Sequence, residues 1–191
     1  MSVLAFDLGA SSGRAVVGRL AGGKLSVEEI HRFPNDPVQA GGRLYWDILR
    51  LYHEVKQGLL KTKSLKGEPI EGVGIDSWAV DFGLIGRNGE LLANPYHYRD
   101  HHTDGVMERV FQLVPQAEIF ARTGLQFLQF NTIYQLYAMK EAGSPLLDQA
   151  ESLLMIPDLL RYFLTGEKKS EYTNASTTQL FLAKERRWDT E

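Results

Sequence analysis

The stretch Asp7-Leu8-Gly9-Ala10-Ser11-Ser12-Gly13-Arg14 lies between two apolar runs, residues 3–6 before it and residues 15–17 after it. This order predicts a strand, a tight turn and a second strand. Small residues let the backbone of such a turn approach a bulky anion, whose oxygens then accept from successive N–H groups and hydroxyls. A carboxylate at the strand end suits a divalent cation, a common partner of phosphate oxygens. The turn is therefore predicted to hold a nucleotide phosphate together with magnesium.

Two widespread phosphate motifs do not fit this stretch. No Gly-Lys-Ser/Thr follows at the spacing of a Walker A loop. The dinucleotide fingerprint needs three glycines that open a helix, whereas a second strand is predicted here. An ordinary hairpin turn with capping serines is the alternative interpretation, and the residues of the turn alone leave it open.

The composition is that of a globular domain. The chain has 191 residues, of which 43% are hydrophobic and 24% charged, and a formal net charge of −3. These values fit one large domain or one lobe of a larger protein, and they give no reason to expect nucleic acid or a membrane as a partner. The sequence shows no secretory signal and no apolar run as long as a membrane span. The chain lacks cysteine, which excludes thiolate chemistry, and we expect a cytoplasmic location.

Hydrophobic periodicity predicts an α/β domain. Consecutive antiparallel strands are expected over 3–8, 14–20 and 25–33. A helix over 45–62 and a strand over 70–75 follow, and this strand is expected to pair in parallel with the first one. The later expected elements are a hairpin over 82–92, helices over 104–114, 116–122 and 132–142, a strand over 153–156 and a helix that begins at Pro157. One mixed sheet with helices on its faces follows from this order.

Five segments, in order along the chain, resemble the N-terminal lobe of the FGGY family of carbohydrate kinases, which are actin-like, ribonuclease-H-like ATPases. The segments are residues 7–14, 74–82, 98–100, 126–132 and 171–179. The turn alone is moderately specific, but the five segments together span nearly the whole chain. The resemblance implies a ribonuclease-H-like fold with a mixed five-stranded βββαβαβα-type sheet, helices on both faces of the sheet, and a sugar-binding insertion.

The turn also suggests which member of the family this sequence resembles. Most of the family has Thr-Thr-Gly-Ser-Thr or a relative there, and Ala-Ser-Ser-Gly-Arg at residues 10–14 is similar to the version in members that act on L-rhamnulose. The resemblance implies transfer of the γ-phosphoryl group of ATP to the 1-hydroxyl of L-rhamnulose, with magnesium. Such kinases are considerably longer, and their second lobe holds the adenosine-binding motifs and the general base. Residues 1–191 are therefore expected to be one lobe, inactive without the C-terminal lobe of the same polypeptide.

The resemblance assigns the nucleotide end of the site to the turn. Asp7 would orient magnesium, directly or through water. The β- and γ-phosphates would be bound by Ala10, Ser11, Ser12, Gly13 and Arg14. Arg14 would also neutralise charge that develops on the transferred group, so Asp7 and Arg14 are the candidate catalytic residues. An exposed strand residue without a catalytic role is the alternative interpretation for Arg14.

The sugar end is assigned to the segment that follows the parallel strand, because ligands of open α/β sheets usually bind at that edge. By resemblance, the expected sugar contacts are Asp76, Trp78, Ala79, Asp81, Arg99, Phe130 and Asn131. In related glycerol kinases an Arg-Glu pair aligns with residues 79–80, and its absence here makes room for a larger ketose. Trp78 fits equally well as a core residue, and residues 127–130 fit equally well as a buried loop.

Three other functions fit the same residues. The protein could be a kinase for another ketose or polyol, since sugar contacts are easily retuned. A non-catalytic actin-like module that binds nucleotide is the second possibility, and a hydrolase that acts on polyphosphate is the third. A metal cluster made of His97, Asp100, His101 and His102 is rejected, because adjacent histidines rarely converge on one ion and no cysteine assists them.

Overall fold

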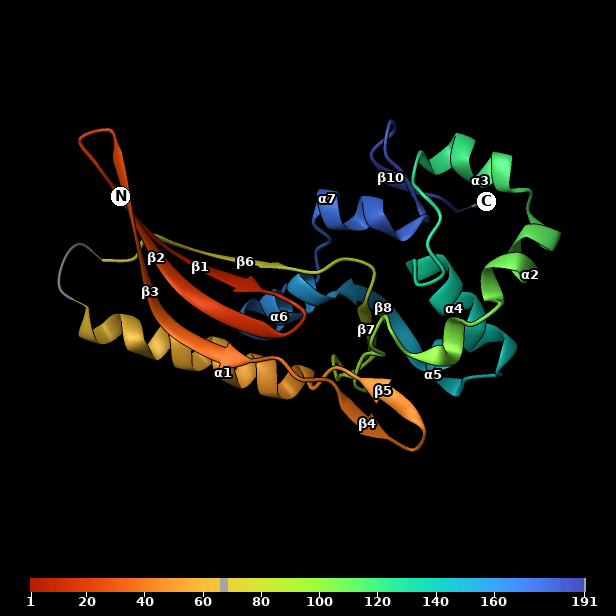
Figure 1. Ribbon diagram of the computed structural model, residues 1–191, viewed down its shortest axis with the longest axis horizontal. Coiled ribbons are helices and arrows are strands. Elements are labelled where there is room, and N and C mark those ends of the chain that lie inside the picture. The colour runs from red at the N-terminus through yellow and green to blue at the C-terminus, as the bar shows by residue number, and fades with distance from the viewer. Residues whose placement is uncertain (66–68, 191) are drawn as a thin grey trace.

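The computed structural model describes residues 1–65 and 69–190 (Figure 1). Its strands are β1 (Ser2–Leu8), β2 (Ser12–Ala21), β3 (Lys24–Pro34), β4 (Val38–Ala40), β5 (Arg43–Tyr45), β6 (Gly72–Ser77), β7 (Phe82–Gly86), β8 (Ala150–Met155), β9 (Phe181–Leu182) and β10 (Arg187–Trp188). Its α-helices are α1 (Ile48–Lys61), α2 (Val106–Leu113), α3 (Gln116–Thr123), α4 (Thr132–Glu141), α5 (Pro145–Gln149), α6 (Ile156–Thr165) and α7 (Tyr172–Ala175). None of the helices in these two ranges has the length and apolar character that crossing a membrane requires.

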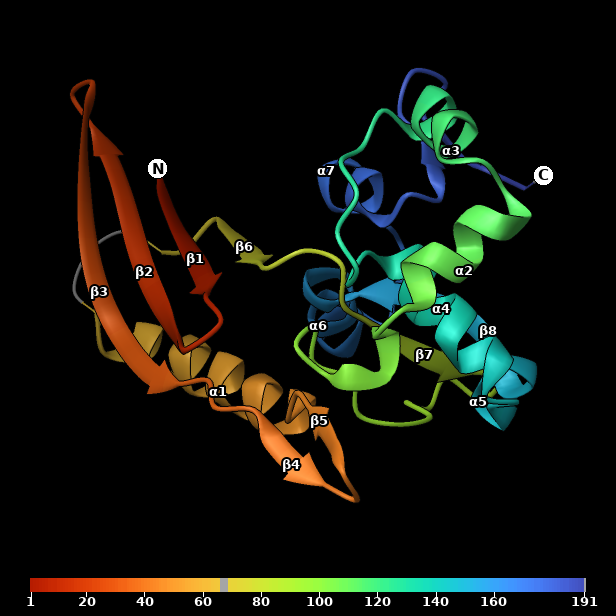
Figure 2. The same cartoon turned by 45° about the vertical axis from the view of Figure 1, so that its right-hand side comes forward.

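A mixed sheet with the strand order β3-β2-β1-β6 forms one end of the molecule, and most of the helices gather at the other end (Figure 2). β1 pairs antiparallel with β2 and parallel with β6. The predicted change of strand direction within one sheet is therefore confirmed. The turn of residues 9–11 and the carboxyl end of β6 come to the same edge of this sheet, because Leu8 lies opposite both Gly13 and Ser77.

The expected fifth strand belongs to a different sheet. β8 pairs antiparallel with β7, with Met155 opposite Phe82 and Leu153 opposite Leu84, so four strands make up the sheet of β1. Between β6 and β7 the chain changes direction at Val80, whose φ of 69° lies in the left-handed region. An apolar run predicts that a strand is buried, but it does not identify the neighbour with which the strand pairs.

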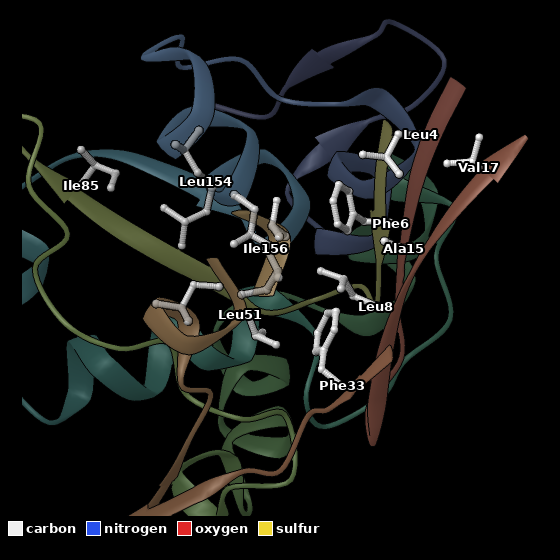
Figure 3. Packing of buried hydrophobic residues seen from close by; sticks show 14 residues of the cluster. Leu4, Phe6, Leu8, Ala15, Val17, Phe33, Leu51, Ile85, Leu154 and Ile156 are labelled. Carbon is white, nitrogen blue, oxygen red and sulfur yellow. The ribbon is translucent and has the colours of Figure 1, made fainter. Parts of the chain in front are cut away.

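The main core covers one face of the four-stranded sheet (Figure 3). Leu4, Phe6 and Leu8 alternate along β1 and have at most 2% of their surface exposed. They share one hydrophobic cluster with Leu51 of α1 and Ile156 of α6. The inward-facing residues of β1, which recur with the strand period of two, thus pack with helix residues that recur with the helical period of 3.6.

The opposite face of the sheet is open in the described part of the chain. Ala5 is exposed on β1, and Leu25 and Val27 of β3 have 67% and 65% of their surface exposed. Register places all three on the face away from Leu4. The helices expected on both faces are therefore found on one face within residues 1–65 and 69–190, where α1 and α6 contribute to the same cluster.

Gly58 shows how closely α1 packs on the sheet. A Cβ at this position would lie 2.5 Å from Cε1 of Phe6 and 3.0 Å from Cβ of Ala15. We expect Gly58→Ala to lower the free energy of unfolding by about 1–3 kcal/mol, because overpacking outweighs the gain in helix propensity of about 1 kcal/mol. Urea unfolding of the chain measures the change. Gly18→Ala is the matched control, since its nearest contacts would lie at 3.5 Å and 3.7 Å, and a stabilised Gly58→Ala variant would contradict the prediction.

Candidate functional site

The turn of residues 9–11, which is predicted to hold phosphate and is called the anion turn below, is closed by hydrogen bonds at the edge of the sheet. The N–H of Gly9 donates to the carbonyl of Ser12 at 2.9 Å. Asn35, just after β3, donates twice: its N–H to the carbonyl of Ser11 at 3.0 Å and its Nδ2 to the carbonyl of Gly9 at 2.8 Å. The N–H groups of Ala10 and Ser11 meet no acceptor among the residues that the structure describes. Such unused donors on successive residues are suited to an anion.

The glycine at the end of the turn is required by packing. A Cβ on Gly13 would lie 2.3 Å from two ring atoms of Phe33 and 2.9 Å from Cδ2 of Leu8. The turn therefore sits directly on the hydrophobic core, which fixes its position. Ser11 is exposed and Ser12 is half-buried, so their hydroxyls lie at the surface side of the turn.

Asp7, Arg14 and Asp76 are charged residues at this edge of the sheet. Arg14 donates from Nε and Nη2 to Oδ2 of Asp7 at 2.8 Å and 2.5 Å. Asp76 lies beside Asp7 in the parallel register of β1 and β6. About half of the Asp7 and Arg14 side chains is exposed (47% and 48%), so this pair contributes little to stability. The structure thus places Asp76, a predicted sugar contact, next to the anion turn.

The carboxylate oxygens at this edge of the sheet are suitable ligands for magnesium. Both bonds from Arg14 go to Oδ2, and Oδ1 of Asp7 accepts no hydrogen bond within residues 1–65 and 69–190. The carboxylate of Asp76 adds oxygens on the neighbouring strand. Magnesium takes oxygen ligands and usually keeps several waters, so one or two carboxylates beside a phosphate site are sufficient.

Four of the predicted sugar residues line one cavity of about 360 Å³: Trp78, Ala79, Phe130 and Asn131. The rest of its wall is formed by Val80, Tyr98, Leu125, Gln126, Leu128 and Thr177. None of these ten lining residues is charged. Aromatic rings with a few amides and hydroxyls are suited to the apolar faces and hydroxyl groups of a sugar. Trp78 therefore contributes to a cavity wall, and it also packs on the main core.

Asp81 lies behind the wall of this cavity. Its side chain is fully buried, and its Oδ2 accepts from Nε1 of Trp46 at 2.6 Å, Nε1 of Trp78 at 3.0 Å and the N–H of Tyr98 at 3.1 Å. Its Oδ1 accepts from Nε2 of Gln135 at 2.8 Å. Burial raises the pKa of Asp81 to about 7, although these four donors act in the opposite direction. In this structure Asp81 holds the cavity wall and does not reach the cavity.

An aromatic stack supports the same wall. Trp46 is fully buried, and 3.9 Å separates its ring centroid from that of Trp78 and from that of His97. Burial and the neighbouring Arg99 lower the pKa of His97 to about 4, and its Nδ1 accepts from the N–H of Arg99 at 3.0 Å, as a neutral imidazole does. The Arg99 guanidinium lies over the ring of Tyr98, 5.3 Å from its centroid. Arg99, a predicted sugar contact, is not among the described residues that line the cavity.

Sequence reasoning missed three residues of the site: Asn35, Trp46 and Gln135. Asn35 lies between two prolines, a pattern that signals only the end of a strand. Trp46 falls at the start of the helix predicted over 45–62, and Gln135 is a polar residue inside an apolar helical stretch. A polar side chain on a buried helix face needs partners, and this is the one signal that the sequence offered for Gln135.

Comparison with known proteins identifies relatives of this chain. The profile of the FGGY family of carbohydrate kinases, N-terminal domain, matches residues 2–191. A protein named rhamnulokinase from Oceanobacillus iheyensis is 47% identical over 186 residues, which cover 97% of this chain and 39% of that protein. Its namesake from Bacteroides thetaiotaomicron is 44% identical over 187 residues, which cover 98% of this chain and 38% of that protein. The chain therefore spans about two fifths of the length of these relatives.

Solved structures agree on the fold. The ligand-bound xylulose kinase from Lactobacillus acidophilus has a TM-score of 0.86 at 19% identity, covering 99% of this chain and 38% of that one. The Plasmodium falciparum glycerol kinase with ADP has a TM-score of 0.79 at 16% identity, covering 98% of this chain and 39% of that one. The expected α/β fold of actin-like sugar kinases is confirmed. The chain belongs to the FGGY family of carbohydrate kinases and matches its N-terminal domain.

Proposed function

We propose that the polypeptide to which this chain belongs transfers the γ-phosphoryl group of ATP to the 1-hydroxyl of L-rhamnulose. The observation that carries this proposal is the identity of 44–47% to proteins named rhamnulokinase over nearly the whole chain. Two features of the site support it. One edge of the sheet offers unused N–H donors, a carboxylate pair and an arginine, and an uncharged aromatic cavity lies within the same domain.

Phosphoryl transfer depends on positioning and on charge neutralisation more than on covalent chemistry by the protein. In this proposal the N–H groups of Ala10 and Ser11 bind phosphate oxygens. Arg14 neutralises the transferred group with the three N–H bonds that its ion pair with Asp7 leaves unused. Magnesium, held by Asp7 and Asp76, would supply positive charge to the phosphates.

The sugar is held in this proposal by the cavity. Trp78 and Phe130 contact its apolar faces, and Asn131 and Tyr98 offer polar groups to its hydroxyls. None of the ten described residues that line the cavity is charged, so a neutral ketose is favoured over a sugar acid. In this proposal the uncharged cavity binds the neutral sugar, and the anion turn binds the negatively charged nucleotide.

The remaining parts of the enzyme belong, in this proposal, to a C-terminal lobe of the same polypeptide. The relatives are more than twice as long as the chain, which covers 39% of the Oceanobacillus iheyensis protein. Such a lobe would supply the adenosine site and the general base. Residues 1–191 by themselves are then expected to bind ATP weakly and to catalyse no turnover, and the complete enzyme is expected in the cytoplasm.

A substrate panel with the complete polypeptide tests the proposal. ADP release is measured with ATP, magnesium and either L-rhamnulose, xylulose, fuculose or glycerol, and the position of the new phosphate is read by NMR. We expect kcat/KM to be highest for L-rhamnulose by about tenfold or more, since one or two contacts in a pocket give this discrimination. Preference for another sugar would overturn the assignment of the substrate. Phosphate release without any sugar would indicate a hydrolase, and nucleotide binding without turnover would indicate a non-catalytic module.

A further inference from the structure

Asn35 connects the anion turn to a strand that is distant from it in sequence. The residue follows β3 and has 4% of its surface exposed. Its Nδ2 donates to the carbonyl of Gly9 at 2.8 Å, and its backbone N–H donates to the carbonyl of Ser11 at 3.0 Å. Two carbonyls of one short turn thus accept from a single buried residue.

These bonds fix the direction of the peptide groups in the turn. In a planar trans peptide the C=O of one residue and the N–H of the next residue point in opposite directions. The carbonyl of Gly9 is directed to Asn35, so the N–H of Ala10 is directed away from it. The same N–H has no acceptor within the described ranges 1–65 and 69–190. Asn35 therefore directs the carbonyl of Gly9 inward and the N–H of Ala10 outward, at the place where an anion would bind.

A neutral amide suits this position for a second reason. A carboxylate here would have no proton to donate to the carbonyl of Gly9, and two acceptors 2.8 Å apart would repel each other. It would also bring a negative charge to the turn that is expected to bind phosphate. The side chain is thus matched both to its buried carbonyl partner and to the charge of the ligand.

We propose that Asn35 is a positioning residue for nucleotide binding, which holds the Gly9–Ala10 peptide so that the Ala10 N–H meets a phosphate oxygen. The inference rests on the proposed function, because it takes ATP as the anion. Asn35 is expected to contact no substrate atom itself. Its effect reaches the nucleotide through a single peptide group.

Two variants of the complete polypeptide, Asn35→Ala and Asn35→Asp, test this role. Both remove the Nδ2 donor and keep the backbone bond to Ser11. The KM for ATP and the Kd for ADP with magnesium are expected to rise about tenfold in Asn35→Ala, the usual effect of one misdirected hydrogen bond to a charged group. A larger rise is expected in Asn35→Asp, which adds a charge and nearly preserves the shape. The KM for the sugar is expected to stay at its wild-type value in both.

Asn131→Ala is the matched control. Asn131 is also a buried asparagine, 2% exposed, and its Nδ2 joins two loops by donating to the carbonyl of Gln126 and to Oε1 of Gln179, each at 2.9 Å. It lies at the cavity, so its loss is expected to raise the sugar KM and to leave the ATP KM unchanged. A purely structural role for Asn35 would not produce this crossed pattern.

The outcomes separate this inference from the proposed function. Equal ADP affinity in wild type and both Asn35 variants, or equal effects on both substrates, would overturn the role of Asn35. A wild-type protein that binds ADP but phosphorylates none of the sugars would overturn the proposed function, and the ADP comparison would still decide the role of Asn35. Circular dichroism shows whether Asn35→Ala is folded, and the near-isosteric Asn35→Asp decides the case if it is not.

Discussion

Replacing Arg14 with alanine in the complete polypeptide is expected to lower kcat for sugar phosphorylation by about 10³-fold and to leave the sugar KM nearly unchanged. Arg14 uses only Nε and Nη2 for its contact with Asp7, so three N–H bonds of the guanidinium remain for phosphate oxygens. These bonds strengthen as charge develops on the transferred group, which raises kcat and not ground-state binding. Steady-state kinetics with varied ATP and varied sugar measures both constants.

Arg32 is the matched control for this prediction. It lies directly beside Arg14 in the register of β2 and β3, and its guanidinium donates to Glu29 at 2.9 Å and 2.5 Å. Arg32→Ala removes a similar charge from the same edge and is expected to keep nearly wild-type kcat. Arg14→Lys is expected to be intermediate, because lysine keeps the charge and loses the planar fork. Similar losses in both alanine variants would show a general electrostatic effect and contradict a specific role for Arg14.

A dependence on magnesium distinguishes two ways in which Arg14 can act. The bond from Arg14 to Oδ2 holds the carboxylate of Asp7 in place. If Arg14 acts only by orienting Asp7, Arg14→Ala changes the magnesium concentration needed for half-maximal rate, and excess magnesium restores kcat. If Arg14 acts on the phosphoryl group, as we expect, the loss of kcat persists at saturating magnesium.

The sequence was most informative where the chemistry is local. The anion turn consists of consecutive residues between two strands, so the sequence predicts both the conformation of the turn and the chemical groups that it carries. The pairing of β1 with β2 and β6 also follows from short hairpins and one helical crossover. Asn35 lies 26 residues from Gly9, and no spacing rule connects them. Its role became visible only when the register of β2 and β3 placed the two ends together.

The sugar-binding residues were harder to predict because the side chains of one short segment lie in three different environments. Asp76 lies near the end of β6, and Trp78 and Asp81 follow it; the sequence predicts that all three contact the sugar. In the structure Asp76 lies beside Asp7, Trp78 lines the cavity and Asp81 is buried behind it. The change of direction at Val80, with φ of 69°, lies between Trp78 and Asp81. Valine is disfavoured in this conformation, so the sequence pattern gave no indication of the turn.

Asp81→Asn is expected to raise the sugar KM by about 10- to 100-fold and to leave the ATP KM close to wild type. The carboxylate accepts four N–H donors, among them those of Trp78 and Tyr98 on the cavity wall. Asparagine has one acceptor oxygen, and its NH₂ group must face one of these donors, which costs about 1–3 kcal/mol for each buried group left unpaired. Asp158→Asn is the control, because Asp158 is an equally buried carboxylate that accepts from the N–H of Glu171 away from this cavity. A shift of the sugar KM in both variants would contradict a specific role for Asp81.

The stability advantage of wild type over Asp81→Asn is expected to depend on pH. Burial raises the pKa of Asp81 to about 7, above the 3.8 of a free side chain. The folded state then binds this proton more tightly than the unfolded state, so the contribution of Asp81 to stability is complete below pH 3.8 and is lost as pH rises through about 7. Urea unfolding at pH 5 and pH 7 is expected to show the advantage of wild type over Asp81→Asn falling by roughly 1 kcal/mol for each pH unit. His97, whose pKa is lowered to about 4, has the opposite dependence but is present in both proteins and cancels. An advantage that stays constant would mean that the four donors keep Asp81 ionised throughout this range.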